Sequence, residues 1–173
     1  MSDPSHLEDE QITEREMSGE KLRRGGKIDD MLCFALYAAS RAAIDVYRPL
    51  LEELGLTYPQ YLVMIVLWER KTCSVKEIGN ILHLDSGTLS PLLKRLEGAG
   101  FIKRQRRVKD ERVVDISLTE QGHALRERAV DVPVKVSCRY GIEFDEYIEL
   151  LERLKKVTER LSVVDTGLQA LTK

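Results

Sequence analysis

The feature that most constrains the fold is a change in the spacing of apolar residues near residue 100. Upstream of it, apolar side chains recur at the intervals of amphipathic helices. Downstream, the β-branched segments FIKRQRR and VVDISL flank the polar turn VKDER, which predicts a two-stranded hairpin over residues 101–118 with its tip near residues 109–111. Any fold for this chain must therefore join a series of helices to a hairpin.

Two helices are predicted in the first part of the chain. Residues 28–54 repeat apolar side chains at helical spacing, and we expect Pro49 to kink the last turn and Gly55 to end the helix. Thr57 is a typical N-cap, so a second helix should start there and run to about Arg70.

Capping signals predict two shorter helices after these. Ser74 is followed three residues later by Glu77, which is the capping-box pattern at the start of VKEIGNIL. Asp85 or Ser86 should cap the segment GTLSPLLKRLEGAG, and a glycine near its end should close it. The two segments are the right length for a helix-turn-helix.

The chain returns to helical spacing after the hairpin. Thr119 is expected to cap a helix that continues to Gly141, with a bend at Pro133. A final helix is predicted for about residues 143–164, and its apolar stripe needs a partner to cover it.

These elements predict a mainly α protein with a small β-hairpin wing, which is the winged helix-turn-helix layout. In that fold the helix before the hairpin enters the DNA major groove, and the wing reaches the neighbouring phosphates or minor groove. We therefore expect a DNA-binding lobe over about residues 57–118. The helices at about residues 28–54 and 119–165 remain for dimerisation.

The charge distribution divides the chain more sharply than its net charge of -2 suggests. Residues 1–20 hold seven acidic residues against one arginine and have little apolar periodicity, so residues 1–27 are predicted to be a disordered acidic tail before a domain at 28–173. Residues 94–112 hold eight basic and three acidic residues, which predicts an anionic partner. No apolar segment suits a signal peptide or membrane span, so we expect a cytoplasmic protein.

Few kinds of chemistry fit the residues available. Three cysteines cannot form a disulfide framework, and the Cys and His spacings do not match a zinc site. The sequence also lacks the G-x-S-x-G, Walker A and G-x-G-x-x-G patterns of hydrolases and nucleotide-binding enzymes. We therefore expect no metal, no cofactor and no chemistry other than that of a thiol.

Longer segments resemble a known family. The phrase KDERVVDISLTEQG, which follows LDSGTLSPLLKRLEGAGFIKRQ, resembles the MarR family of dimeric transcription regulators. The segments MLCFALY and LTYPQYLVMIVLWE are similar to its organic-hydroperoxide-sensing branch, the OhrR repressors, and the likeness covers roughly residues 28–165. The resemblance implies a homodimeric repressor that binds a palindromic operator, is not an enzyme, and takes organic hydroperoxide as its effector.

The same resemblance assigns roles to two cysteines and two tyrosines. In OhrR-like proteins the thiol that matches Cys33 is the peroxide sensor, and tyrosines matching Tyr47 and Tyr58 of the partner subunit hold it. Cys33 and Tyr47 are 14 positions apart, which is ~21 Å along one helix, so they cannot touch within a straight helix. In the two-cysteine type, a thiol matching Cys138 of the other subunit captures the sulfenic acid as a disulfide. Cys73 matches no family role and is expected to be structural.

The resemblance also places the DNA contacts on the fourth helix and the wing. In the wing, Asp110 and Arg112 match an Asp-x-Arg pattern in which the arginine enters the minor groove and the aspartate orients it. For the helix residues, capping or simple solvation is the alternative to a base or phosphate contact. The further DNA-binding candidates are Ser86, Thr88, Ser90, Pro91, Lys94, Arg95, Arg106 and Arg107.

Two other functions stay open at the level of sequence. The first keeps DNA binding but makes the effector a small aromatic or phenolic ligand in the dimer crevice, with Cys33 incidental. The second is a thiol peroxidase that uses Cys33 catalytically. The absence of a recognisable peroxidase motif and the basic hairpin, which an enzyme does not need, argue against the second.

Overall fold

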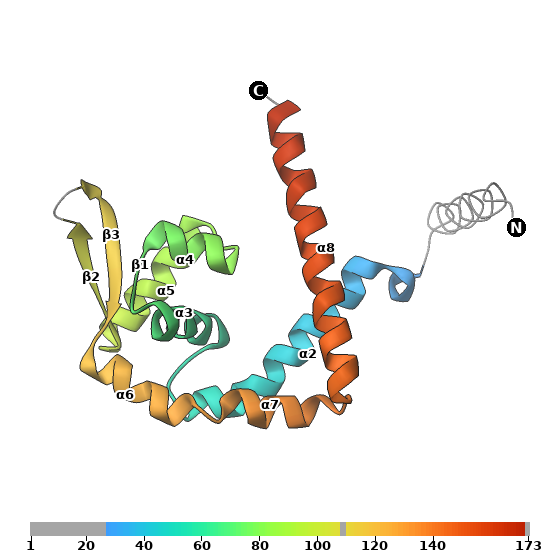
Figure 1. The fold of residues 1–173 in the computed structure, drawn as a ribbon, viewed down its shortest axis with the longest axis horizontal. Helices are drawn as coiled ribbons and strands as arrows, with labels where there is room; N and C mark the ends of the chain where they lie inside the picture. The colour runs from blue at the N-terminus through green and yellow to red at the C-terminus, as the bar shows by residue number, and fades with distance from the viewer. Residues whose placement is uncertain (1–26, 108–109, 172–173) are drawn as a thin grey trace, which may run out of the picture. The chain divides into compact units, whose positions relative to one another are not determined.

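The computed structural model describes residues 27–107 and 110–171, and its backbone is drawn in Figure 1. Most of the predicted acidic tail, residues 1–26, and two residues of the hairpin tip lie outside the described residues. The chain divides into two compact units, the first ending at Arg128 and the second beginning at Ala129.

The first unit holds the predicted helices and the wing. In chain order its elements are η1 (Ile28–Asp30), α2 (Leu32–Glu52), α3 (Tyr58–Arg70), β1 (Thr72–Ser74), α4 (Val75–Leu82), α5 (Ser86–Gly98), β2 (Ile102–Arg107), β3 (Asp110–Leu118) and most of α6 (Glu120–Ala129). The second unit contains α7 (Val132–Tyr140) and α8 (Phe144–Leu171).

The core of the first unit lies between α3, α4, α5 and the sheet, which stand side by side in Figure 1. Helix α3 is the central element, because it contacts α4, α5, β1 and β3. The side chains that are almost completely buried here come from α3, α4, α5 and β3: Val63, Met64, Leu67, Ile78, Leu89, Leu93, Leu96 and Ile116. Burial of each such aliphatic side chain contributes roughly 1.5–3 kcal/mol, which fixes α4 and α5 relative to the wing.

Local capping explains where the helices begin. The Ser74 amide donates to Glu77 Oε2 (2.7 Å) and the Glu77 amide donates to Ser74 Oγ (3.2 Å), so the predicted capping box is confirmed. At α5 the Thr88 amide donates to Asp85 Oδ1 (2.9 Å). Asp85, rather than Ser86, is therefore the cap.

The first predicted helix is interrupted near its start. Residues 28–30 form a 3-10 turn and Met31 is extended, with φ -91° and ψ 117°, so α2 begins only at Leu32. The preceding Asp29 and Asp30 favour turns over helix interiors, because their carboxylates compete for backbone amides. At its other end α2 stops at Glu52, and Gly55 adopts a left-handed φ of 69°.

The predicted hairpin is confirmed as β2 and β3, and a third strand that the sequence did not predict joins it. Strand β1 pairs antiparallel with β3, with Cys73 opposite Ile116, and gives a three-stranded sheet in the order β1-β3-β2. Three residues are too few to show alternation, so apolar spacing does not reveal β1. The wing is therefore tied to the end of α3 as well as to α5.

The prediction of one helix from Thr119 to Gly141 was wrong. It is divided into α6 and α7 by Val130 and Asp131. Pro133 lies in the first turn of α7, where its missing amide does no harm, whereas in a continuous helix its ring would clash with the Ala129 carbonyl. The final helix, α8, is longer than predicted and continues to Leu171.

Candidate nucleic-acid interface and thiol sites

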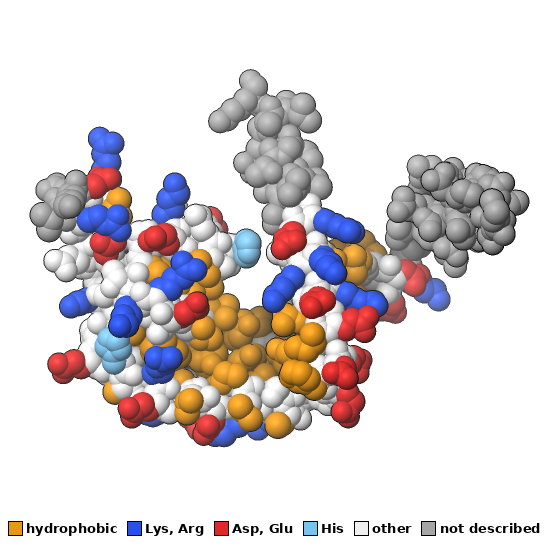
Figure 2. Space-filling model, in the orientation of Figure 1, with side chains coloured by type: hydrophobic (Ala, Val, Ile, Leu, Met, Phe, Trp, Pro, Cys, Tyr) orange, Lys and Arg blue, Asp and Glu red, His pale blue; other side chains and the backbone are white. Residues whose placement is uncertain are grey.

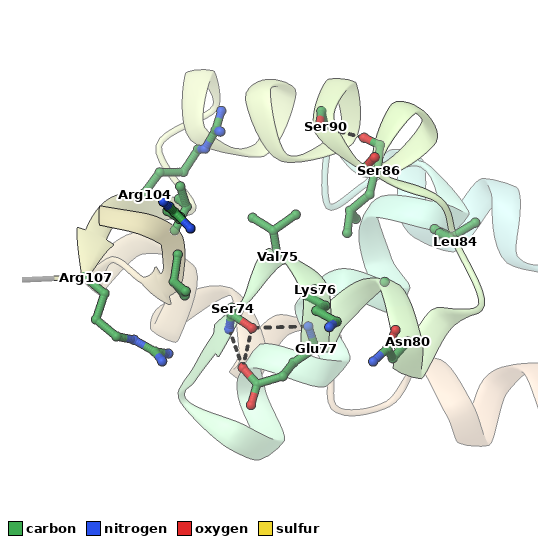
Figure 3. A pocket seen from close by; sticks show the side chains of 15 residues that line it. Ser74, Val75, Lys76, Glu77, Asn80, Leu84, Ser86, Ser90, Arg104 and Arg107 are labelled. Carbon is green, nitrogen blue, oxygen red and sulfur yellow. Dashed lines mark hydrogen bonds between the residues drawn. The ribbon is translucent and has the colours of Figure 1, made fainter. Parts of the chain in front are cut away.

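A cleft of about 690 Å³ lies between α4, α5 and the wing in the first unit. Figure 3 shows Arg104 and Arg107 approaching it from the wing side and Ser86 and Ser90 from α5. Arg112 also lines it. In Figure 2 the Lys and Arg side chains over this unit are interspersed with Asp and Glu side chains. The cleft is therefore edged by cations and hydroxyl groups, which suits a phosphate backbone.

Helix α5 has one face buried against the core and one polar face exposed, as a recognition helix requires. Leu89, Leu93 and Leu96 are buried against the core. The predicted DNA-contacting residues of this helix are all exposed: Ser86, Thr88, Ser90, Pro91, Lys94 and Arg95.

Two hydroxyl groups on α5 already make local hydrogen bonds. The Thr88 hydroxyl donates to Asp85 Oδ2 (2.7 Å) and the Ser90 hydroxyl donates to the Ser86 carbonyl (2.6 Å). The Thr88 hydroxyl and amide hold the pKa of Asp85 below its ordinary value, so this cap stays ionised. Thr88 therefore has a capping role beside any DNA contact.

In the wing, Arg107 is bound within the sheet. Its guanidinium donates to both carboxylate oxygens of Asp115, Nε to Oδ2 at 3.0 Å and Nη2 to Oδ1 at 2.6 Å. This pair lowers the pKa of Asp115 and raises the pKa of Arg107. Sequence reasoning assigned Arg107 to DNA and missed Asp115. The pair fixes Arg107 against Asp115, but the Arg107 side chain stays 47% exposed and Arg106 beside it is also exposed. Contact of either arginine with DNA stays a prediction.

Asp110 contacts the backbone of Arg112 rather than its guanidinium in the described structure. Asp110 Oδ1 accepts a hydrogen bond from the Arg112 backbone amide at 3.1 Å. The register between β2 and β3 shifts at this point, between Arg106 and Arg107. The aspartate therefore holds the backbone at the start of β3, and in this way sets where the exposed Arg112 projects.

The three cysteines differ in exposure. Cys33 on α2 and Cys138 on α7 are exposed, whereas Cys73 is buried. Burial, with a smaller contribution from Glu77, raises the pKa of the Cys73 thiol, so Cys73 is a poor nucleophile. Burial supports the prediction that Cys73 is structural, and that role stays a prediction.

The structure brings Tyr47 of α2 and Tyr58 of α3 together, with ring centroids 4.9 Å apart. Cys33 lies in the same unit and Cys138 in the other. The predicted assembly of these tyrosines with a thiol of the partner subunit stays a prediction.

Sequence reasoning missed a second set of aromatic residues beside this pair. Tyr61 is buried and lies 6.1 Å, centroid to centroid, from both Tyr47 and Trp68. Burial raises the pKa of Tyr61, with a smaller contribution from Tyr58. The helical spacing of the aromatic residues in YPQYLVMIVLW is the sequence signal for this set.

The residues that the structure describes contain neither a metal-binding cluster nor a membrane-spanning helix. They contain no group of three or more His, Cys, Asp or Glu placed to hold a metal ion. Within the same residues, no helix is both long enough and apolar enough to cross a membrane.

Comparisons with known proteins agree with this geometry. The sequence model of one family, described as transcriptional regulator SarA/Rot, matches residues 45–128. The organic hydroperoxide resistance transcriptional regulator of Bacillus subtilis (strain 168) is 55% identical over 107 residues, which is 62% of this chain and 73% of that protein.

Two solved structures of AbfR, a protein of Staphylococcus epidermidis, also align with the chain. Reduced AbfR bound to DNA gives a TM-score of 0.67 and 35% identity over 83% of this chain and 97% of that one. Disulfide-formed AbfR gives a TM-score of 0.55 and 35% identity over 85% and 97%. The winged helix-turn-helix prediction is confirmed by these likenesses. The chain belongs to the MarR family of transcriptional regulators.

Proposed function

We propose that this regulator is a DNA-binding repressor that releases its operator when an organic hydroperoxide oxidises Cys33. The observation that carries the proposal is the exposed thiol of Cys33 on α2, in a chain 55% identical to a regulator named for organic hydroperoxide resistance. The Cys33 thiolate attacks the terminal peroxide oxygen and the O–O bond breaks, which leaves a sulfenic acid on Cys33 and an alkoxide that takes a proton from water to become the alcohol. The family consists of regulators, so the peroxidase alternative is not retained.

Binding to double-stranded DNA is supported by the cleft and by the likeness to AbfR, which has been solved bound to DNA. Helix α5 would enter the major groove with its exposed polar face, and Arg112 would reach the minor groove beside it. Arg107 and Asp115 would hold the wing in place for this contact.

A homodimer is supported by apolar side chains that the single chain leaves uncovered. Soluble monomers rarely expose so many large apolar residues, and regulators with two reading heads match palindromic operators by two-fold symmetry. The exposed residues are Ile28, Met31, Leu32 and Tyr37 near the start of the first unit, and Phe144, Ile148, Leu150, Leu154 and Leu161 on α8.

In the second step the Cys138 thiol of the partner subunit attacks the sulfenic sulfur, which forms a disulfide and releases water. Exposure of both Cys33 and Cys138 supports this pairing, as does the existence of a disulfide-formed AbfR. Movement of the helices that carry the two sulfurs would then displace the two α5 helices from half-sites one turn apart.

Non-reducing gels test this pairing. Oxidised wild type should migrate as a covalent dimer, whereas oxidised Cys138→Ser should stay monomeric because its sulfenic acid has no resolving thiol. Cys73→Ser is the matched control and should still cross-link, since Cys73 is buried. Covalent dimers in Cys138→Ser, or a disulfide mapped to Cys73, would contradict the assignment.

Arg112→Ala should weaken operator binding by roughly 1–3 kcal/mol and reduce the salt dependence by about one counterion, because it removes a cation from the groove. Fluorescence anisotropy with an operator selected by the wild-type protein measures both quantities. Arg153→Ala, an exposed arginine of α8 that pairs with Glu149, is the control and should bind as wild type does. Equal affinities for Arg112→Ala and wild type would remove the wing from the interface.

A further inference from the structure

A continuous row of aromatic rings runs along α3 from the tyrosines of the proposed thiol site. Tyr58 and Tyr47 are 4.9 Å apart between centroids, Tyr47 and Tyr61 6.1 Å, and Tyr61 and Trp68 6.1 Å in an edge-to-face arrangement. Tyr61 is 3% exposed, so it is held by the core and has little space to move alone. A displacement of Tyr47 or Tyr58 would therefore shift Tyr61 and, through it, the indole ring of Trp68.

Trp68 ends this row with a directional bond. Its indole Nε1 donates to the backbone carbonyl of Gly122 at 2.9 Å, across 54 residues of sequence. Gly122 lies in the first turn of α6, directly after the wing. The indole thus joins α3, which carries Tyr58 and Tyr61, to the segment that follows the DNA-binding lobe.

The start of α6 is fixed to the base of the wing. A Cβ atom at Gly122 would lie 2.0 Å from the Phe101 carbonyl oxygen and 3.2 Å from Leu118 Cδ2, so the two backbones are in direct contact. The Thr119 hydroxyl donates to the Gly100 carbonyl at 2.6 Å, and the Thr119 amide donates to the Phe101 carbonyl at 3.1 Å. Any force on Gly122 is therefore applied to both ends of the hairpin.

We propose that Trp68 is the positioning residue that couples the tyrosines of the thiol site to the base of the DNA-binding wing. This inference rests on the proposed function and adds to it the route between the sensor and the reading head. Oxidation of Cys33 in one subunit displaces Tyr47 and Tyr58 of the other subunit. Within that other subunit Tyr61 transmits the displacement along α3, and the indole hydrogen bond transmits it to α6 and the wing. The thiol site and the DNA-binding wing then both act on the connection between α3 and α6. A shared structural element of this kind is the physical requirement for coupling between two sites.

The test is Trp68→Phe, which keeps a ring beside Tyr61 but removes the indole N–H. The affinity of the reduced variant for the operator should stay close to that of reduced wild type. The rate at which peroxide consumes the Cys33 thiol should also be unchanged. The ratio of oxidised to reduced dissociation constants should fall by at least about fivefold, the lower end of typical allosteric couplings. Val63→Ala, on the same helix and 0% exposed in the native chain, controls for lost stability and should keep the wild-type ratio.

Fluorescence gives a second readout that does not depend on DNA, because Trp68 is the only tryptophan in the sequence. Its emission should change when wild type is oxidised and should not change in Cys33→Ser. In Tyr61→Leu, which interrupts the row, Cys33 should still oxidise but the emission change should be lost. Tyr61→Leu also tests the coupling route if Trp68→Phe does not fold.

The outcomes separate the two proposals. Wild type that keeps its operator after Cys33 is oxidised would overturn the proposed function, and the coupling route with it. Wild type that releases its operator, together with a Trp68→Phe protein that releases it equally well and an emission change that survives in Tyr61→Leu, would overturn the coupling route alone.

Discussion

Cys33→Ser should bind the operator as reduced wild type does, within about threefold, and should not release it when organic hydroperoxide is added. Serine preserves the size of an exposed side chain, and such changes usually alter stability by less than about 0.5 kcal/mol. It removes the nucleophilic thiolate, so no sulfenic acid forms. In wild type the same peroxide should raise the dissociation constant by about 10-fold to 100-fold. Anisotropy titrations before and after one equivalent of peroxide measure both proteins.

Cys73→Ser is the matched control for this experiment and should release the operator as wild type does. Its thiol is buried and its pKa is raised by that burial, so peroxide meets little thiolate there. A Cys33→Ser protein that still dissociates on oxidation would mean that another residue is the sensor. Wild type that keeps its operator after addition of peroxide would instead favour the small-ligand alternative.

Gly122→Ala should cause the largest loss of stability among single glycine substitutions in the described part of the chain. The new methyl group would lie 2.0 Å from the Phe101 carbonyl oxygen, which is backbone and cannot move without displacing the wing. We expect a loss of at least about 3 kcal/mol in the free energy of unfolding, together with a lower melting temperature and weakened operator binding. Denaturant titration followed by circular dichroism measures the first quantity.

Gly98→Ala is the control for that substitution. Gly98 ends α5, and a Cβ there meets no atom within 4 Å, so alanine should be neutral or stabilising by up to about 1 kcal/mol. Equal stabilities for the two variants would show that α6 does not press on the base of the wing. That result would also remove the mechanical basis for coupling through Trp68.

The parts of the fold that local sequence determines were predicted well. The Ser74–Glu77 capping box and the start of α5 depend on residues three apart in the chain, so their signals are complete within a short window. The same holds for the exposed and buried faces of α5 and for the basic hairpin. The order of these elements was enough to predict the winged helix-turn-helix.

The parts that depend on distant residues were not predictable. The three residues of β1 form a strand because they pair with β3, more than 40 positions later in the chain. The Arg107–Asp115 pair depends on the register across the hairpin. The Trp68–Gly122 bond likewise joins segments with no shared pattern. The surroundings of Cys33 could not be predicted from one chain for a similar reason. The tyrosines that are expected to hold its thiol belong to a second copy of the chain.

The most direct test of the central claim is a reversible cycle with wild-type protein on its own selected operator. Anisotropy of a labelled operator is followed for reduced protein, after one equivalent of organic hydroperoxide, and after dithiothreitol. Loss of binding on oxidation, accompanied by loss of the Cys33 thiol and followed by recovery on reduction, is the predicted result. Oxidation of Cys33 with no change in operator affinity would contradict it.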